Sequence, residues 1–394
     1  MKDVVIVSGA RTAVGSFQGA LSGVKVTKLG SIVIAEALKR AGVAPDQVDE
    51  VIMGCVLPAG LGQAPARQAA IAAGIPASIG ATTINKVCGS GLKAVMLADA
   101  MIKAGDAEII VAGGMESMTQ APYLLPDARK GFRMGPKSAV DSMVHDGLWN
   151  IYTDEHMGSC ADMLAREWKI SREDQDAFAI KSYHKAQSAT ESGAFKPEIV
   201  PVEIPQRKGE PVIFDEDEEP KRLKKDKVPA LRPAFNKDGS VTAANASSIN
   251  DGAAAVVVMS ADKAKELGLK VLARIVGHDQ AAKEPEWFTL APIDATRKVL
   301  KKTGLKIEQM DLIELNEAFG VQVLAAEREL GLDMSKVNVK GGAVAIGHPI
   351  GCSGARILVT LIYAMMERNA NLGLATLCIG GGEAVAMIVS RENL

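Results

Sequence analysis

The chain has 394 residues, 47% of them hydrophobic and 23% charged, which allows two or three compact units of roughly 100–200 residues with large buried cores. The net charge of −2 argues against nucleic acid as the main partner, because phosphate binding needs a basic surplus. No continuous apolar run reaches the ~18 residues that span a bilayer. Five cysteines without a Cys-x-x-Cys pair favour neither a disulfide framework nor a metal site, so we expect a reducing, cytoplasmic setting.

The first predicted element is a buried strand at residues 4–7. This stretch lacks the longer apolar segment and the small-residue cleavage site of a signal peptide. Residues 34–52 then predict a helix, a glycine stop at Gly42, a short helical turn and a second strand.

The same pattern recurs 262 residues later, at residues 296–313. Four identities keep this offset: Leu38 with Leu300, Gly42 with Gly304, Gln47 with Gln309, and Asp49 with Asp311. Residues 87–93 (VCGSGLK) and 350–356 (IGCSGAR) match at nearly the same offset, and each precedes a predicted helix and an apolar strand. We therefore predict two homologous α/β halves, residues 1–118 and 268–394. The alternative is a chance likeness of two α/β segments.

Residues 119–250 differ from both halves, because they are more polar and richer in proline. The charged run at residues 215–227 breaks any apolar periodicity, whereas residues 166–187 predict a helix that Ser171 helps to start. We predict an inserted loop domain here, after which the chain returns to the first half until about residue 267. Binding residues tend to gather on such loops.

Cys88 lies at a predicted strand-to-helix turn, in the sequence NKVCGSGL (residues 85–92). A thiol at this place meets the positive end of a helix dipole, which predicts a lowered pKa and a thiolate nucleophile. The small residues that follow leave room for a substrate carbonyl and expose backbone N–H donors. The alternative is a buried cysteine that packs as a small hydrophobe.

His348 lies among glycines at the corresponding turn of the second half, in GHPIGCSG (residues 347–354). If a pseudo-two-fold axis relates the halves, the two turns face each other. Cys88 and His348 are then neighbours, as a nucleophile and its activating base must be. The alternative is a structural histidine that caps a loop.

Two further candidates lie at predicted strand ends. Cys378 precedes three glycines whose backbone N–H groups are free to bind an oxyanion, although a thiol alone at this position is typical of a core. Asn316, in LNEAF (residues 315–319), can hold a water or a substrate oxygen, or form a turn.

Together, the motifs NKVCGSG, NEAF, GHPIGCSG and CIGGG, in this order, strongly resemble the thiolase family, in particular its acetyl-CoA acetyltransferases (acetoacetyl-CoA thiolases). The likeness extends from residues 6–12 to the C-terminal strand. It implies a thiolase fold, with two duplicated α/β halves in a five-layered αβαβα sandwich and an inserted loop domain. It also implies ping-pong Claisen condensation of two acetyl-CoA to acetoacetyl-CoA and CoA, or the reverse thiolysis, without a metal or bound cofactor.

The resemblance also implies roles for the site residues. Cys88 would carry the acyl group, and His348 would deprotonate Cys88 and then stabilise the thioester oxygen. Cys378 would move the α-proton, and Asn316 would hold a water that forms one oxyanion hole with His348. The backbone N–H groups of Cys88 and Gly380 would form the other.

For coenzyme A, the resemblance implies seven contact residues: Ser247, Ala243, Phe235, Leu148, His156, Met157 and Phe319. The basic residues of the 221–225 stretch are either phosphate contacts or a solvated charge run, and this stretch matches the family poorly. Trp287 and Glu383 depart from the family pattern, and Phe288 with Met157 would close the acyl pocket. Residues 117–143 resemble a tetramerisation loop, so we expect a homotetramer formed as a dimer of dimers.

Three other functions remain as alternatives. A 3-ketoacyl-CoA thiolase with broader chain length or branched specificity would differ in its pocket shape. A ketoacyl synthase would have no second active-site cysteine, which Cys378 argues against. A non-enzymatic acyl-CoA-binding protein would be expected to lack catalytic residues, and none is missing.

Overall fold

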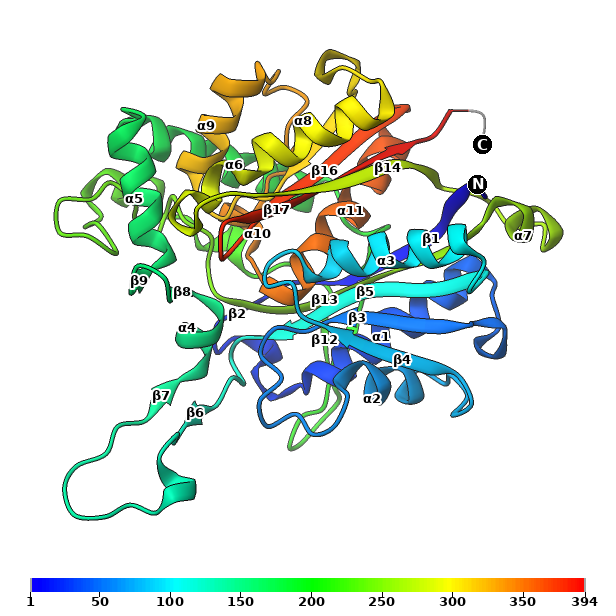
Figure 1. The fold of residues 1–394 in the computed structure, drawn as a ribbon, viewed down its shortest axis with the longest axis horizontal. Coiled ribbons are helices and arrows are strands. Elements are labelled where there is room, and N and C mark those ends of the chain that lie inside the picture. The colour runs from blue at the N-terminus through cyan, green and yellow to red at the C-terminus, as the bar shows by residue number, and fades with distance from the viewer. Residues whose placement is uncertain (1, 393–394) are drawn as a thin grey trace.

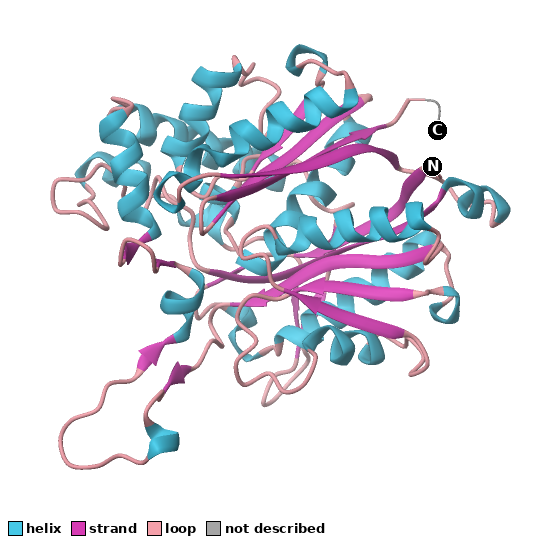
Figure 2. Ribbon diagram, viewed as in Figure 1, coloured by secondary structure: helices cyan, strands magenta, loops and turns pink. Residues whose placement is uncertain are grey.

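The computed structural model, which describes residues 2–392, is built around one large mixed sheet with helices on both sides (Figures 1 and 2). The first part contains β1 (Val4–Thr12), β2 (Gly15–Ser16), α1 (Val26–Ala41), β3 (Glu50–Gly54), α2 (Pro65–Ala72), β4 (Gly80–Ile84), α3 (Ser90–Ala104) and β5 (Ile109–Ser117). The last part contains β13 (Asn250–Ser260), α7 (Ala261–Glu266), β14 (Ala273–Ala282), α8 (Ala291–Thr303), β15 (Leu312–Leu315), α9 (Gly320–Leu330), α10 (Ala343–Ile346), α11 (Ile350–Glu367), β16 (Leu372–Ile379) and β17 (Glu383–Ser390).

The 11-stranded sheet has two arms that meet at β1 and β14. Its main path runs β15-β16-β17-β14-β1-β13-β5-β3-β4, and the short strands β10 (Ile199–Val200) and β2 add to β1 and β13. In the described part of the chain, the strand pairs across the junction are Val5 with Arg274 and Ile6 with Ala273. The two predicted halves therefore share one continuous sheet, a connection that no local pattern in the sequence indicates.

Two helices, α3 and α11, pack against each other between the arms, and each also contacts strands of both (Figure 1). On the outer faces, α1 and α2 cover the first arm, and α8 covers the second with α9 against it. A Cβ at Gly91 would meet the backbone of Ala355, and one at Gly354 would meet that of Leu92. Glycine at these positions lets the first turns of α3 and α11 touch, and each helix begins two residues after a site residue, Cys88 or His348.

The predicted repeat is visible in matching local structure. The helices α1 and α8 both end at a left-handed glycine, Gly42 or Gly304, each with φ of 70°. Asp49 accepts hydrogen bonds from the backbone N–H groups of residues 108 and 109, and Asp311 accepts the equivalent pair from residues 371 and 372. Equivalent residues therefore make equivalent contacts in the two arms.

The region between the halves contains β6 (Tyr123–Leu124), β7 (Val140–Asp141), α4 (Ser142–Gly147), β8 (Trp149–Asn150), β9 (Glu155–His156), α5 (Met157–Glu167), α6 (Arg172–Glu191), β11 (Val202–Ile204) and β12 (Val212–Phe214). The helix start predicted at Ser171 is confirmed, because its side chain caps α6 by accepting from the N–H of Asp174. The first residues of the predicted range, 166 and 167, instead end α5, and Lys169 between the two helices has a left-handed φ of 51°. The segment around β6 and β7 projects away from the rest of the protein (Figure 1).

Among residues 2–392, one helix has the length and composition of a membrane span. This helix is α11, with mean hydropathy 1.3, and 83% of it is buried inside the protein. Its apolar side chains pack between the two arms of the sheet, as those of a core helix do.

Candidate active site

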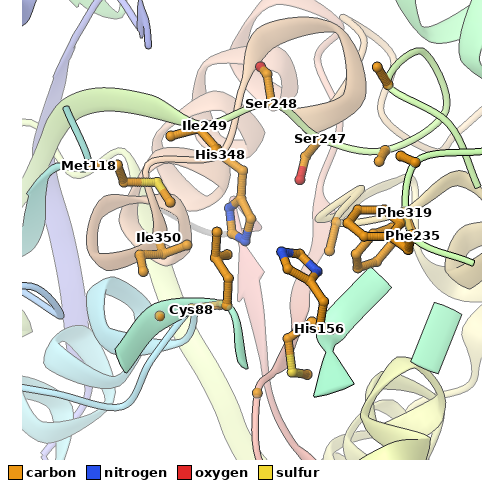
Figure 3. A pocket seen from close by; sticks show the side chains of 18 of the residues that line it. Cys88, Met118, His156, Phe235, Ser247, Ser248, Ile249, Phe319, His348 and Ile350 are labelled. Carbon is orange, nitrogen blue, oxygen red and sulfur yellow. The ribbon is translucent and has the colours of Figure 1, made fainter. Parts of the chain in front are cut away.

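A cavity of about 400 Å³ opens where the first turns of α3 and α11 approach the inserted region. Figure 3 shows the imidazoles of His348 and His156 within it, with Phe235 and Phe319 on one side and Met118 and Ile350 on the other. Cys88, Cys378 and Gly380 also line the cavity. Residues from both arms and from the insertion therefore meet at one place.

Cys88 lies in a strained turn between β4 and α3. The preceding Val87 has a φ of 46°, which is unusual for a β-branched residue. Ser90 fixes the turn, since its hydroxyl donates to the carbonyl of Val87 at 2.7 Å and accepts from the N–H of Lys86 at 2.8 Å. The backbone N–H groups of Cys88 and Gly380 both act to lower the pKa of the thiol. Two backbone groups from different arms thus favour negative charge at one sulfur.

The predicted low pKa of Cys88 is wrong. Burial raises the pKa of this thiol to about 11, and the two backbone N–H groups offset only part of that effect. The loss of water around the sulfur, which depends on the folded chain, causes this difference. In the resting site Cys88 is therefore a neutral thiol that needs a base.

The imidazole of His348 is held in one orientation. Ser353 Oγ donates to the carbonyl of Pro349 at 3.0 Å and lies 2.6 Å from Nδ1 of His348. Since the hydroxyl proton is already used, the serine accepts from Nδ1–H, which leaves Nε2 as the basic nitrogen. Nε2 has no partner among residues 2–392. Burial, assisted by the positive charge of Arg356, lowers the pKa of His348 to about 3 and keeps the ring neutral.

Cys378 is 1% exposed and lines the same cavity at the end of β16. Burial, together with the nearby Cys88, raises its pKa well above the ordinary value of a thiol. Its Sγ lies 3.6 Å from Oε1 of Gln322 on α9. The second thiol is therefore neutral at rest, as the first one is.

Asn316 is buried directly after β15 and is not among the residues that line the cavity. Its Oδ1 accepts from Arg356 Nη2 at 3.5 Å, and its Nδ2 has no partner among the described residues. An unpartnered buried amide N–H is a typical place for a water. Asn316 therefore does not contact the cavity directly in this structure.

All seven residues predicted for coenzyme A line the cavity: Ser247, Ala243, Phe235, Leu148, His156, Met157 and Phe319. His156 stacks on Phe235 with 4.5 Å between ring centroids, and its Nδ1 caps α5 by accepting from the N–H of Gly158. Of the basic stretch at 221–225, Arg222 lines the cavity. Lys221 instead pairs with Glu216 at 2.7 Å.

Trp287 and Glu383, the two departures from the family pattern, lie in different surroundings. Trp287 is not among the residues that line the cavity, whereas its neighbour Phe288 lines it and packs edge-on against Phe319. Glu383 pairs with Lys86, with both carboxylate oxygens 2.5 Å from Nζ. This ion pair links the turn that carries Cys88 to the turn that carries Gly380.

Sequence reasoning missed three residues that hold the site in place. Buried Glu116 accepts from the N–H groups of Val56, Leu57 and Gly351, and burial raises its pKa to about 7. Asn250 Oδ1 accepts from the N–H of His348 at 2.8 Å. Ser353 lies in the GHPIGCSG motif, five residues after His348, and this spacing was the one signal of its role in the sequence.

A cavity that holds two thiols, a neutral imidazole and backbone N–H donors, between two similar α/β arms, is that of a thiol-dependent acyltransferase. Models of the thiolase N-terminal and C-terminal domains match residues 4–262 and 269–391. The acetyl-CoA acetyltransferases of Pseudomonas aeruginosa and Cupriavidus necator are 57% and 58% identical over 393 residues, covering 100% of each chain. Acetyl-CoA acetyltransferase 2 of Arabidopsis thaliana is 53% identical over 98% of this chain and 97% of its own. The chain belongs to the thiolase family.

Proposed function

We propose that this thiolase condenses two molecules of acetyl-CoA to acetoacetyl-CoA and free CoA, and catalyses the reverse thiolysis. The observation that carries the proposal is the meeting of Cys88, Cys378 and His348 in one cavity. Both thiols are neutral at rest, and the imidazole presents a free basic nitrogen. The names of the full-length relatives agree with this substrate.

In the first half-reaction, His348 Nε2 takes the proton of Cys88 and the sulfur attacks the thioester carbonyl. The backbone N–H groups of Cys88 and Gly380, which both favour negative charge at the sulfur, are placed to stabilise the oxyanion. The tetrahedral intermediate collapses to an acetyl-cysteine at Cys88. The leaving CoA thiolate takes the proton of Cys378, so the site then holds an imidazolium and a second thiolate.

In the second half-reaction, the Cys378 thiolate removes an α-proton from a new acetyl-CoA. His348, now protonated, and a water on Asn316 stabilise the enolate oxygen. The enolate carbon attacks the acetyl group on Cys88 and forms acetoacetyl-CoA. The released Cys88 thiolate recovers its proton from His348, and Cys378 keeps the α-proton, which restores the resting site.

The acyl end of the cavity favours a short chain. Met157 lies close to Gly380, and Phe288 and Phe319 meet edge-on beside it. Trp287 lines no part of the cavity, so the residue that departs most from the family is no reason to expect a longer substrate. These contacts favour acetoacetyl-CoA over the alternative of a 3-ketoacyl-CoA thiolase with broader or branched specificity.

Thiolysis rates with acetoacetyl-CoA and 3-ketohexanoyl-CoA test the proposal. We expect the shorter substrate to have the higher kcat/KM, and Cys88→Ser to lose activity on both. Sustained activity on 3-ketohexanoyl-CoA would favour the broader thiolase. Activity retained by Cys88→Ser would refute the acyl-cysteine intermediate.

We also infer that the two arms are the duplicated halves of a five-layered αβαβα sandwich, over residues 1–118 and 268–394. The inserted domain covers residues 119–250, and β13 supports the return to the first half because it pairs with β1 and β5. The five unpaired cysteines support a reducing, cytoplasmic setting.

We propose in addition that the projecting segment around β6 and β7 joins two dimers into a homotetramer. Four large apolar side chains on or beside it are exposed: Tyr123, Leu125, Phe132 and Met134, the last one completely. Apolar side chains gathered on a projecting segment are typical of an association surface. Light scattering of the wild type and of Met134→Asp tests this. We expect the mass of a tetramer for the wild type and the mass of a dimer for Met134→Asp. A dimer mass for the wild type would refute the proposal.

A further inference from the structure

The amide of Gln322 faces the thiol of Cys378 inside the protein. Cys378 Sγ lies 3.6 Å from Gln322 Oε1, and the exposed fractions of the two residues are 1% and 0%. Gln322 stands in the first turn of α9, directly after the NEAF segment, where its backbone N–H is bonded to the carbonyl of Phe319. A backbone fixed in this way holds the side chain against the sulfur.

The other end of the same amide is free. Gln322 Nε2 is buried and has no hydrogen-bond partner among residues 2–392. An amide presents an acceptor at one end and two donors at the other, and a half-turn about its last side-chain bond exchanges them. Such a half-turn breaks no other hydrogen bond made by this side chain. The amide can therefore offer Cys378 either end at little cost.

Cys378 needs both the acceptor end and the donor end of the amide during the proposed reaction, on which this inference rests. As a thiol it donates to an acceptor, which Oε1 supplies in the resting structure. As a thiolate between the two half-reactions it needs a donor, because a buried charge without a hydrogen bond is costly. We propose that Gln322 is a positioning residue that serves both protonation states of Cys378, accepting from its thiol and donating to its thiolate.

The surroundings of Cys378 make this donor important. Burial disfavours negative charge on Cys378. The imidazoles of His348 and His156 also line the cavity, and His348 becomes cationic when Cys378 becomes anionic in the proposed sequence. Gln322 adds a neutral donor that remains beside the sulfur in every step.

Two substitutions of similar length separate the roles of the amide. Gln322→Met keeps the volume but has neither donor nor acceptor of comparable strength, and Gln322→Glu keeps only acceptors when its carboxyl group is ionised. We measure deuterium uptake at the α-carbon of acetyl-CoA in D2O, which reports on Cys378. We also measure alkylation of Cys88 by iodoacetamide, resolved by peptide mass, which reports on the nucleophile and on correct folding.

We expect both variants to lose about 10- to 100-fold in α-deuterium uptake, the value of a hydrogen bond to a charged group. Alkylation of Cys88 should stay within about twofold of the wild type, because no charge-dependent step at Cys378 takes part in it. The midpoint of the pH profile of uptake should rise by about one unit or more, since the thiolate has lost its donor. A residue that only filled space would not move this midpoint.

Three outcomes would overturn the inference. Wild-type uptake with an unchanged pH midpoint in Gln322→Met would show that the amide has no such function. An equal loss of uptake and of Cys88 alkylation would show a packing role. Wild-type uptake by Cys378→Ala would instead remove Cys378 from the proposed mechanism itself, which distinguishes failure of that mechanism from failure of Gln322.

Discussion

His348 Nδ1 lies 2.6 Å from Ser353 Oγ, and this contact decides which nitrogen of the ring acts as the base. Because the serine hydroxyl donates its one proton to the carbonyl of Pro349, its oxygen acts as the acceptor toward Nδ1–H. Nε2 is thereby left basic and directed away from the serine. A side chain without direct contact to the nucleophile thus sets the base.

Ser353→Ala should therefore lower kcat by about 10- to 100-fold with little change in KM, because the imidazole loses its fixed tautomer and orientation. Steady-state thiolysis of acetoacetyl-CoA measures both constants. Cys352→Ala, at the adjacent buried position on α11, is the matched control and should keep kcat within a few-fold. Equal losses in the two variants would mean that α11 packing, rather than the hydrogen bond, is responsible.

The resting Cys88 and His348 form a neutral pair, because burial raises the pKa of the thiol to about 11 and lowers that of the imidazole to about 3. Alkylation of Cys88 by iodoacetamide should rise roughly tenfold per pH unit between about pH 7 and 9, as the thiolate fraction does below its pKa. The rate per pH, resolved by peptide mass, measures this. A plateau from acid to neutral pH would instead indicate a thiolate–imidazolium pair in the resting enzyme.

The ion pair of Lys86 with Glu383 joins the turns that carry the two oxyanion donors, Cys88 N–H and Gly380 N–H. Glu383→Gln should lower kcat about two- to fivefold, the value of a partly exposed pair. The charge-reversed double variant Lys86→Glu/Glu383→Lys should recover most of the loss.

High salt should reduce the difference between the wild type and Glu383→Gln, since salt screens exposed charges. Lys2→Met removes the surface pair with Glu108 at 3.6 Å and serves as the control without effect. If the double variant is as impaired as the sum of the singles, the pair does not align the donors.

Met157 lines the cavity and lies beside Gly380, where we propose that it limits the length of the acyl chain. Met157→Ala removes several side-chain atoms and should raise the kcat/KM ratio of 3-ketohexanoyl-CoA to acetoacetyl-CoA by about tenfold or more. Met365→Ala empties a core position between the arms of the sheet and should leave this ratio unchanged. An unchanged ratio in Met157→Ala would place the chain-length limit elsewhere.

Much of this site could be predicted from the sequence, because its catalytic side chains occur at turns with strong local sequence signals. Glycines and small residues around Cys88, His348 and Cys378 mark places where the backbone approaches closely, and the repeat at an offset of 262 residues predicts that two of these turns correspond. The structure brings all three side chains into one cavity. The stops at Gly42 and Gly304 follow from local chemistry in the same way.

What the sequence did not predict depends on long-range contacts. Glu116 bonds residues about 60 and 235 positions away along the chain, and Asn250 bonds His348 at a separation of 98. The pKa of Cys88 went the opposite way to the prediction because burial, which only the folded chain creates, exceeds the effect of the two backbone N–H groups. The junction of β1 with β14 has no local pattern, since it uses just two residue pairs.

The proposed reaction depends on an acetyl group carried by Cys88. To detect it, the wild type is mixed with acetyl-CoA, quenched in acid and digested for mass spectrometry. We predict one acetyl group on the peptide that contains Cys88, its loss when free CoA is added before the quench, and none on that peptide in Cys88→Ser. An acetyl group on Cys378 instead, or turnover of acetoacetyl-CoA without any acetylated cysteine, would refute the acyl-Cys88 intermediate.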